Sequence, residues 1–283
     1  MAETPILAQP VSLSATNHAG VRIKNIGNAK HLADSHFAKI YTPEFSKAGV
    51  DYPVIFVKDP DSSNFFAAGM WGLEPGENLF VEDGIWQGGY FPASVRCFPF
   101  AVQADPEDKD RLLIGIYEDA SIVSKEEGNL IFNEDGIETE WMDNVKEFLV
   151  RVFQQEEMTK VFVKSLNDLD LLVNQTLTIS DAKTDKKQEV SGFYVVDKEK
   201  LANLPDDKLL ELRKSGALEV IHCHIMSLES LDKLLRKKNI RPLTESVASE
   251  MGKEKAANET TSTETAPPAE ETPPAKETPP AEE

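Results

Sequence analysis

Residues 267–283 repeat a short unit that cannot contribute to a hydrophobic core. The unit begins with two prolines and continues with alanine and charged residues, as in Pro267–Thr272 and Pro273–Thr278. Paired prolines fix the backbone dihedral φ and remove hydrogen-bond donors, and from Met251 onward the chain contains no aromatic residue, valine or isoleucine. The sequence therefore predicts a disordered, acidic, Pro/Glu-rich tail over residues 246–283. A solubilising spacer and a docking motif for a partner both fit this composition.

The remainder of the chain has the composition of a folded protein. Of the 283 residues, 40% are hydrophobic, which is enough to bury a sizeable core. We expect a globular domain over residues 20–245, preceded by a flexible N-terminus over residues 1–19. The formal net charge is -19. Because affinity for nucleic acids and anionic lipid surfaces comes mainly from lysine and arginine, neither is an expected partner.

The sequence also bears on where the protein is found. No run approaches the roughly 18 apolar residues that a membrane span needs, so we expect no span. Residues 1–10 lack the basic and apolar regions of a secretory signal peptide. With only Cys97 and Cys223, a disulfide framework is excluded, although a single bridge remains open. We expect a cytoplasmic protein; the alternative is the cell surface, reached by a route without a cleaved N-terminal signal.

Short apolar segments bounded by turn-forming residues alternate with amphipathic ones. Residues 141–156 carry an apolar face at helical spacing, and residues 160–172 form a second helical stretch, so we expect an antiparallel helix pair. Residues 205–215 predict a helix that Gly216 ends, and residues 228–238 predict a C-terminal helix with Ser227 as its N-cap. The expected fold is α+β, with a mixed or mostly antiparallel sheet. Its expected strands are residues 54–57, 65–73, 112–117, 177–179, 192–196 and 218–226.

His222 and His224 are the candidate metal ligands. On a strand, side chains two residues apart point to the same face, so this pair could supply two ligands to one metal ion. The alternative is a pair of half-buried histidines with a structural role. We expect no cofactor, since no phosphate-binding, dinucleotide-binding or hydrolase motif is present.

Arg96 is the leading candidate for ligand binding. It lies in the apolar, aromatic segment 90–100, so its guanidinium needs a carboxylate partner or must reach solvent. If Glu77 is that partner the pair is structural, and otherwise Arg96 could bind an anionic ligand. Glu77 and Asn78 follow a proline–glycine turn, where their side chains can bond to local backbone. Together with His224, these residues form the candidate ligand-binding set.

The segment from Trp71 to Trp86, continuing from Tyr90 to Phe100, closely resembles the signature of the bacterial SapC family. Further matches run through residues 130–136, 192–197 and 224–228, and the resemblance covers roughly residues 20–240. The family name implies an association with bacterial surface layers, but the resemblance implies no established reaction.

Two functions are therefore expected from the sequence. The favoured one is a non-catalytic structural or accessory protein that binds a protein partner in surface-layer or cell-envelope biology. The alternative is a small-molecule-binding protein or an enzyme whose pocket lies near residues 86–100. The residues leave the oligomeric state open.

Overall fold

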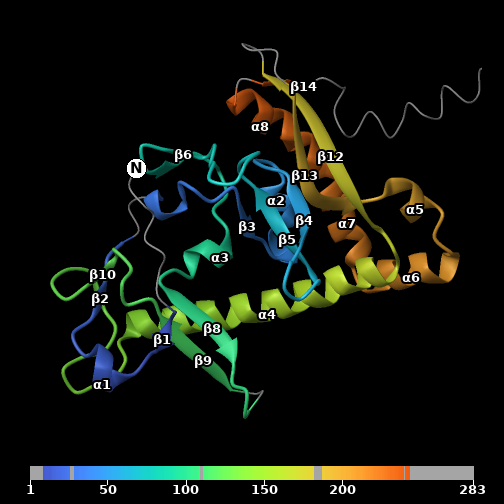
Figure 1. Ribbon diagram of the computed structural model, residues 1–283. Coiled ribbons are helices and arrows are strands. Elements are labelled where there is room, and N and C mark those ends of the chain that lie inside the picture. Colours follow the sequence, from blue (N-terminus) through green and yellow to red (C-terminus); the bar gives the residue numbers. More distant parts are fainter. Residues whose placement is uncertain (1–8, 26–28, 109–110, 182–186, 239, 243–283) are drawn as a thin grey trace, which may run out of the picture.

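A six-stranded antiparallel sheet is the largest sheet in the computed structural model, which describes residues 9–25, 29–108, 111–181, 187–238 and 240–242 (Figure 1). Its strand order is β14-β12-β13-β4-β5-β3. The strands are β3 (Phe37–Lys39), β4 (Val54–Lys58), β5 (Phe65–Met70), β12 (Leu172–Asp181), β13 (Lys187–Val196) and β14 (Ile240–Pro242). The predicted strands at residues 54–57, 177–179 and 192–196 are confirmed, and the one at 65–73 ends at residue 70.

The remaining strands form smaller sheets of two or three strands. In the described part of the chain, β9 pairs with both β1 and β8, β2 pairs with both β10 and β11, and β6 pairs with β7. The predicted strand at residues 112–117 is confirmed as β9. The bounds are β1 (Val11–Ser12), β2 (Arg22–Ile23), β6 (Val81–Glu82), β7 (Ile85–Trp86), β8 (Phe100–Ala104), β9 (Leu112–Ile116), β10 (Val123–Ser124) and β11 (Asn129–Leu130).

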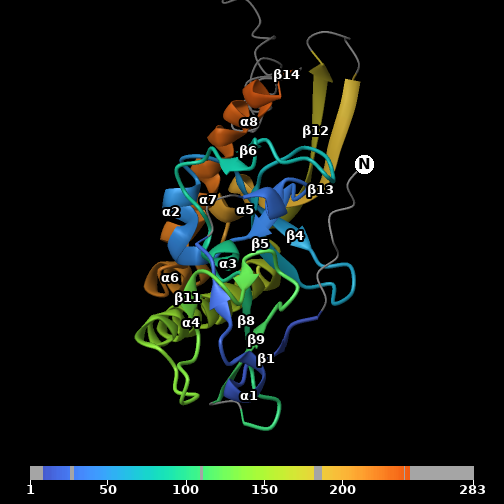
Figure 2. The same ribbon diagram turned by 90° about the vertical axis from the view of Figure 1, so that its left-hand side faces the viewer.

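Helices cover one side of the large sheet. Figure 2 shows α2, α7 and α4 on one side of β4 and β5. The α-helices are α1 (Ala15–His18), α2 (Phe45–Ala48), α3 (Ala93–Arg96), α4 (Glu140–Asp168), α5 (Lys198–Ala202), α6 (Asp206–Lys214), α7 (Ala217–Ser227) and α8 (Leu231–Lys237). Short 3₁₀ turns are η1 (Lys30–Leu32), η2 (Thr42–Glu44) and η3 (Leu228–Ser230). The predicted α+β class and the mostly antiparallel sheet are confirmed.

The predicted antiparallel helix pair is wrong, because its two segments are one helix of 29 residues, α4. The Thr139 hydroxyl caps its first turn by accepting from the backbone N–H of Met142. No glycine or proline interrupts residues 140–168, so nothing forces a turn. The polar stretch that suggested a connection is the part of the helix between two separate hydrophobic cores.

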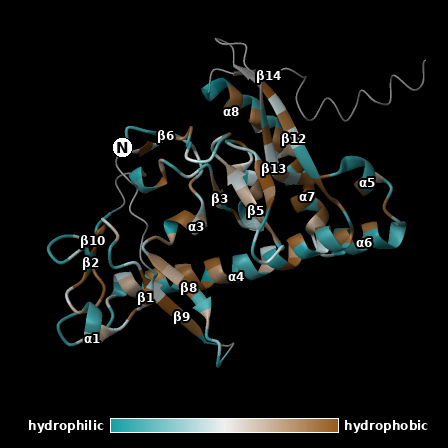
Figure 3. Ribbon diagram, viewed as in Figure 1, coloured by the Kyte–Doolittle hydropathy of each residue, from teal (hydrophilic) through white to brown (hydrophobic). Residues whose placement is uncertain are grey.

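Hydrophobic and hydrophilic residues alternate along α4 (Figure 3), and the hydrophobic ones near its two ends pack into these two cores. Near its N-terminus, Met142 and Leu149 pack into a smaller core with Phe100. Near its C-terminus, Phe162 and Leu166 pack into the main core against the large sheet. One helix therefore belongs to both cores.

The predicted strand at residues 218–226 is wrong, because these residues lie in helix α7. Its buried side chains include Ala217, Ile221 and His224, whose spacing places them on one helical face. The run is long enough for three helical turns, and its apolar composition fits a helix packed on β4 and α2 as well as it fits a strand. Gly216, at φ 78°, separates α6 from α7, which confirms the predicted end of the preceding helix.

Two boundary predictions also change. Residues 9–19, predicted as flexible, contain β1 and α1, and His18 is buried. Ser227 lies directly before η3, but its side chain makes no capping bond. Its hydroxyl instead donates to the carbonyl oxygen of His224 and accepts from the N–H of Val54, which ties α7 to β4. The C-terminal helix is confirmed as α8. The predicted tail at 246–283 lies outside the described residues.

Within the described ranges, no helix is both long and apolar enough to span a bilayer, α4 included. Charged and polar residues occur throughout α4 between its hydrophobic ones.

Candidate functional site

A groove of about 450 Å³ lies between α4 and the β4–β5 hairpin. One wall is a single face of α4, because its lining residues fall at helical spacing: Glu156, Thr159, Lys160, Val163, Lys164, Asn167 and Asp168. This face is about 18 Å long. The other walls come from the hairpin turn at residues 59–64, from Phe65–Ala67 of β5 and from Lys39–Tyr41 at the end of β3. The groove is therefore long and partly apolar, with a charged rim.

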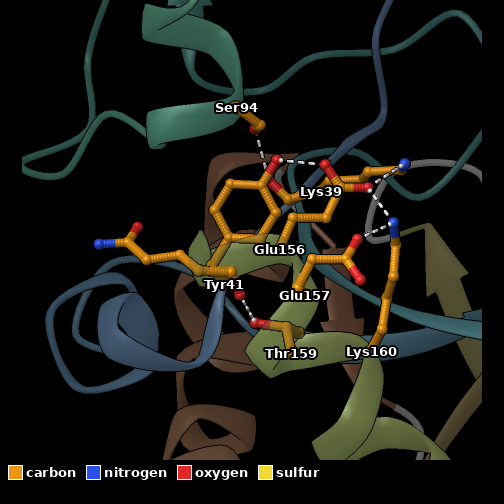
Figure 4. A network of polar contacts seen from close by, with 8 residues as sticks. Lys39, Tyr41, Ser94, Glu156, Glu157, Thr159 and Lys160 are labelled. Carbon is orange, nitrogen blue, oxygen red and sulfur yellow. Dashed lines mark hydrogen bonds and ion pairs between the residues drawn. The ribbon is translucent and has the colours of Figure 1, made fainter. Parts of the chain in front are cut away.

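Glu156 is at the centre of the polar network at one end of the groove (Figure 4). Its carboxylate lies 3.4 Å from Nζ of Lys39 and 3.3 Å from Nζ of Lys160, and the Tyr41 hydroxyl donates to it at 3.5 Å. Burial raises the pKa of Glu156, but the two lysines outweigh burial and hold that pKa below its usual range. Glu156 is therefore ionised at neutral pH.

Lys160 and Tyr41, two partners of Glu156, both remain protonated near neutral pH. Burial lowers the pKa of Lys160, but Glu157 at 2.7 Å and Glu156 more than offset it, so the pKa is raised. Burial, and then the nearby Glu156, raise the pKa of Tyr41 well above its usual value. The phenol stays protonated and remains a donor, so this end of the groove presents a stable set of charges over the physiological pH range.

Further bonds hold the walls together. The backbone N–H of Thr42 donates to Oγ1 of Thr159 at 2.9 Å, which joins η2 to α4. Oγ of Ser94, in α3, donates to the carbonyl oxygen of Lys39 at 2.6 Å (Figure 4). Behind them, the buried carboxylate of Glu44 accepts from the N–H groups of Tyr41 and Ala93 and from the Tyr90 hydroxyl, at 3.0, 2.8 and 2.6 Å. The groove therefore has a rigid frame.

The opposite wall is shaped by the turn between β4 and β5. The Asp59 carboxylate accepts from the N–H groups of Asp61 and Ser62 at 2.8 and 3.0 Å, and these bonds lower its pKa. Ser63 takes a φ of 58°, in the left-handed region. The turn thereby presents Ser62, Ser63 and Asn64 to the groove.

One sheet edge is open inside the groove. β3 runs beside β5 only as far as the bond from the N–H of Ile40 to the carbonyl oxygen of Ala67, since η2 begins at Thr42. Peptide groups of an antiparallel strand alternate in direction, so those of Phe65 point the same way as those of Ala67. Phe66 points toward Val57 on β4 instead. Among the described residues, no strand lies opposite the N–H and C=O of Phe65.

The structure separates Arg96 from its predicted carboxylate partner. The Arg96 guanidinium lies over the Phe148 ring, 5.2 Å from its centroid. Glu77 instead accepts from the N–H of Leu73 at 2.8 Å and pairs with Lys238 at 2.9 Å. The predicted Glu77–Arg96 pair is therefore wrong, because the turn directs Glu77 toward the C-terminal helix.

Asn78 has the local role that the turn predicts. Its side-chain amide donates to the carbonyl oxygen of Leu32 at 2.8 Å, and its Oδ1 accepts from the N–H of Phe80 at 2.9 Å. Glu77 and Asn78 lie in one loop, whereas Arg96 lies in α3 and His224 in α7, and none of the four lines the groove.

The geometry predicted for the histidine pair is also wrong. Residues two apart on a helix point about 200° apart, so His222 is exposed while His224 is fully buried. His224 Nδ1 bonds the carbonyl oxygen of Val54 at 2.9 Å, and its Nε2 accepts from the N–H of Val196 at 3.1 Å. Both ring nitrogens are therefore occupied. Over the described residues, no group of three or more histidine, cysteine or acidic side chains is placed to hold a metal ion.

The two cysteines are separate free thiols, so the single bridge left open by the sequence is not formed. Burial raises the pKa of Cys97 to about 12 and also raises the pKa of Cys223. Neither thiol has the depressed pKa of a catalytic cysteine.

The groove itself was missed from the sequence. Glu156, Lys160, Lys164 and Asp168 recur every four residues, which places them on one helical face only if residues 140–168 form a single helix. Dividing this stretch into two helices hid that spacing. The absence of a helix-breaking residue between positions 156 and 160 was the signal that could have revealed it.

Comparison with protein families matches residues 13–234 to the family described as SapC. No curated protein and no solved structure matches the chain.

Proposed function

Because the chain belongs to the SapC family, we propose that it is a non-catalytic accessory protein that binds an extended segment of a protein partner in the groove along α4. The favoured setting is surface-layer or cell-envelope biology, to which the family name points. We place the protein in the cytoplasm, with the cell surface as the alternative.

The open edge of β5 carries this proposal. Proteins commonly bind extended segments by adding them as a strand to a free sheet edge, where backbone hydrogen bonds supply affinity and flanking pockets supply specificity. The N–H and C=O of Phe65 face the groove without a strand opposite them in the described chain. A partner's backbone can complete these bonds, while its side chains contact the ring of Phe65 and the polar face of α4.

The charges of the groove support binding in preference to catalysis. Lys39 and Lys160 share Glu156, and Lys164 pairs with Asp168 at 2.5 Å. Paired charges of this kind can make a binding surface selective for a partner of complementary charge. Catalysis by a general base would instead need a side chain whose pKa lies near the working pH. The pKa values of Glu156 and Lys160 move away from neutrality instead.

Site-specific photocrosslinking in cells that express the chain naturally tests this function. A photoreactive residue replaces Asn167, an exposed lining residue of the groove. The matched control is the same residue at Glu147, which is exposed on α4 but does not line the groove. We expect a discrete protein adduct from position 167, identified by mass spectrometry, and none from position 147.

A second substitution makes the result specific to the groove. Lys164→Glu reverses a charge of the rim and should strongly reduce the adduct from position 167. Equal adducts from both positions, or no protein adduct from position 167, would overturn the proposed function.

A further inference from the structure

A second cavity, of about 160 Å³, lies beside the segment that joins α3 to β8. It is bordered by residues 23–25, by residues 96–100 and by the N-terminal half of α4. Asn129 also lines it. Because no residue lines both cavities, the two sites can be tested separately.

The walls of this cavity are mostly aromatic and aliphatic. Phe100 and Trp141 lie against each other with ring centroids 6.3 Å apart, and Val145, Phe148 and Leu149 follow along the same face of α4. An apolar cavity of about 150 Å³ is large enough to bind benzene. The cavity is therefore large enough to hold one ring.

The charge at this cavity is positive. Arg96 lines it with its guanidinium over the ring of Phe148, and none of the ion pairs among the described residues involves Arg96. A guanidinium has five N–H donors in a planar fork that suits a carboxylate. Lys24 adds a second cation to the lining, although it pairs with Glu127 at 2.5 Å.

The acidic group beside Tyr90, a neighbour of Arg96, is engaged elsewhere. Burial, and then the nearby Glu44, raise the pKa of Tyr90 well above its usual value, although Arg96 opposes this shift, and the protonated hydroxyl donates to Glu44 at 2.6 Å. Glu44 in turn accepts from two backbone N–H groups. The guanidinium therefore faces a phenol oxygen on this side, and its remaining donors are available to a ligand.

We propose that this cavity binds a small monocyclic carboxylate, with its ring against the side chains of Phe100, Trp141 and Phe148 and its carboxylate on the guanidinium of Arg96. The aromatic walls make apolar contacts with the ring. The planar guanidinium of Arg96 favours a carboxylate over a neutral group. Cys97 also lines the cavity, but burial keeps its thiol protonated, so the site binds its ligand without thiol chemistry.

Titration of the full-length chain with benzoate tests the proposal. We expect saturable binding by calorimetry, accompanied by a change in tryptophan fluorescence, because Trp141 is in the wall. Benzamide has nearly the same shape but no charge, and it should bind about tenfold or more weakly. Trp141→Phe should remove most of the fluorescence change while calorimetry still detects binding.

Substitutions at Arg96 decide whether the guanidinium selects the carboxylate. Arg96→Gln should weaken benzoate binding about tenfold or more, and Arg96→Lys should weaken it less, since the charge remains but the fork is lost. Arg151→Gln is the matched control, because Arg151 is exposed on α4 outside the cavity. Circular dichroism of each variant verifies that it is folded.

Three results would overturn the proposal: no saturable binding of benzoate, equal binding of benzamide, or unchanged binding by folded Arg96→Gln protein. None of them affects the groove, whose partner is detected by crosslinking at position 167.

Discussion

Nδ1 of His224 lies 2.9 Å from the carbonyl oxygen of Val54, which joins helix α7 to the sheet across 170 residues of sequence. Nε2 of the same ring accepts from the N–H of Val196 on the neighbouring strand. A neutral imidazole with its proton on Nδ1 satisfies both bonds. This histidine therefore connects β4, β13 and α7 inside the main core.

The buried imidazole should make stability depend on pH. Burial lowers the pKa of His224 to about 4, despite the bond to Val54, whereas the unfolded chain has the ordinary value of 6.5. Between these values the unfolded state binds a proton that the folded state excludes. Stability is therefore fully present above pH 6.5 and falls as the pH drops toward 4, by roughly 3 kcal/mol in total.

Urea unfolding at pH 7 and pH 5 measures this dependence. His224→Phe should lower the free energy of unfolding at pH 7 by about 2 to 4 kcal/mol, since two backbone groups lose their partner. It should also reduce the loss of stability between pH 7 and pH 5. His222→Gln, on the exposed side of α7, is the control and should leave both quantities unchanged; a full pH dependence in folded His224→Phe protein would contradict the assignment.

Glu44 should be among the least replaceable side chains near the groove. Its carboxylate is 3% exposed and accepts from two backbone N–H groups and one phenol. Glu44→Ala leaves two buried backbone N–H groups and the half-buried hydroxyl of Tyr90 without a partner, and should destabilise the protein by about 3 kcal/mol or more. Urea unfolding at pH 7 provides the measurement, with exposed Glu147→Ala as the neutral control. An effect below about 1 kcal/mol would show that water replaces the carboxylate.

Gly49 should be required because α2 and α7 approach each other too closely there for a side chain. Its φ is -62°, which any residue adopts, but a Cβ atom there would lie 2.7 Å from Cβ of Ser227 and 2.9 Å from the carbonyl oxygen of Phe45. Gly49→Ala should push α2 from α7 and cost about 1 to 3 kcal/mol. Ser46→Ala, on the exposed side of α2, should cost little. Equal melting temperatures of the two variants would contradict the close approach.

The open sheet edge predicts a contrast between neighbouring amides. The N–H of Phe65 faces the groove, whereas the N–H of Phe66 faces Val57 on β4. Phe65 should therefore exchange its amide hydrogen with solvent much faster than Phe66, as measured by nuclear magnetic resonance in deuterated water. Comparable protection of both amides would mean that the edge is closed in solution.

The sequence predicts local elements where local patterns dominate. The β4 and β9 strands, the helix ended by Gly216 and the C-terminal helix follow from apolar runs and turn residues that act over a few positions. The predictions failed where packing between distant parts of the chain decides the secondary structure. In α4 the polar stretch around residues 154–160 lies between two cores, which only the tertiary structure reveals, and in α7 an apolar run fits strand and helix equally.

The same limit applies to the candidate sites. The aromatic segment around Arg96 was recognised from its composition, and the structure places a cavity there. The carboxylate assigned to Arg96 was wrong, because the direction of Glu77 depends on Lys238, which is distant in sequence. The groove depends on the contact between α4 and the β4–β5 hairpin, which no local pattern encodes.

The continuity of α4 affects how the protein can be divided. A cut within this helix would leave each core with only part of the helix that packs against it. Neither half of the chain should therefore fold as an independent unit. The smaller core should then melt together with the main one in a single cooperative transition, and a deletion of the first 130 residues should fail to yield folded protein.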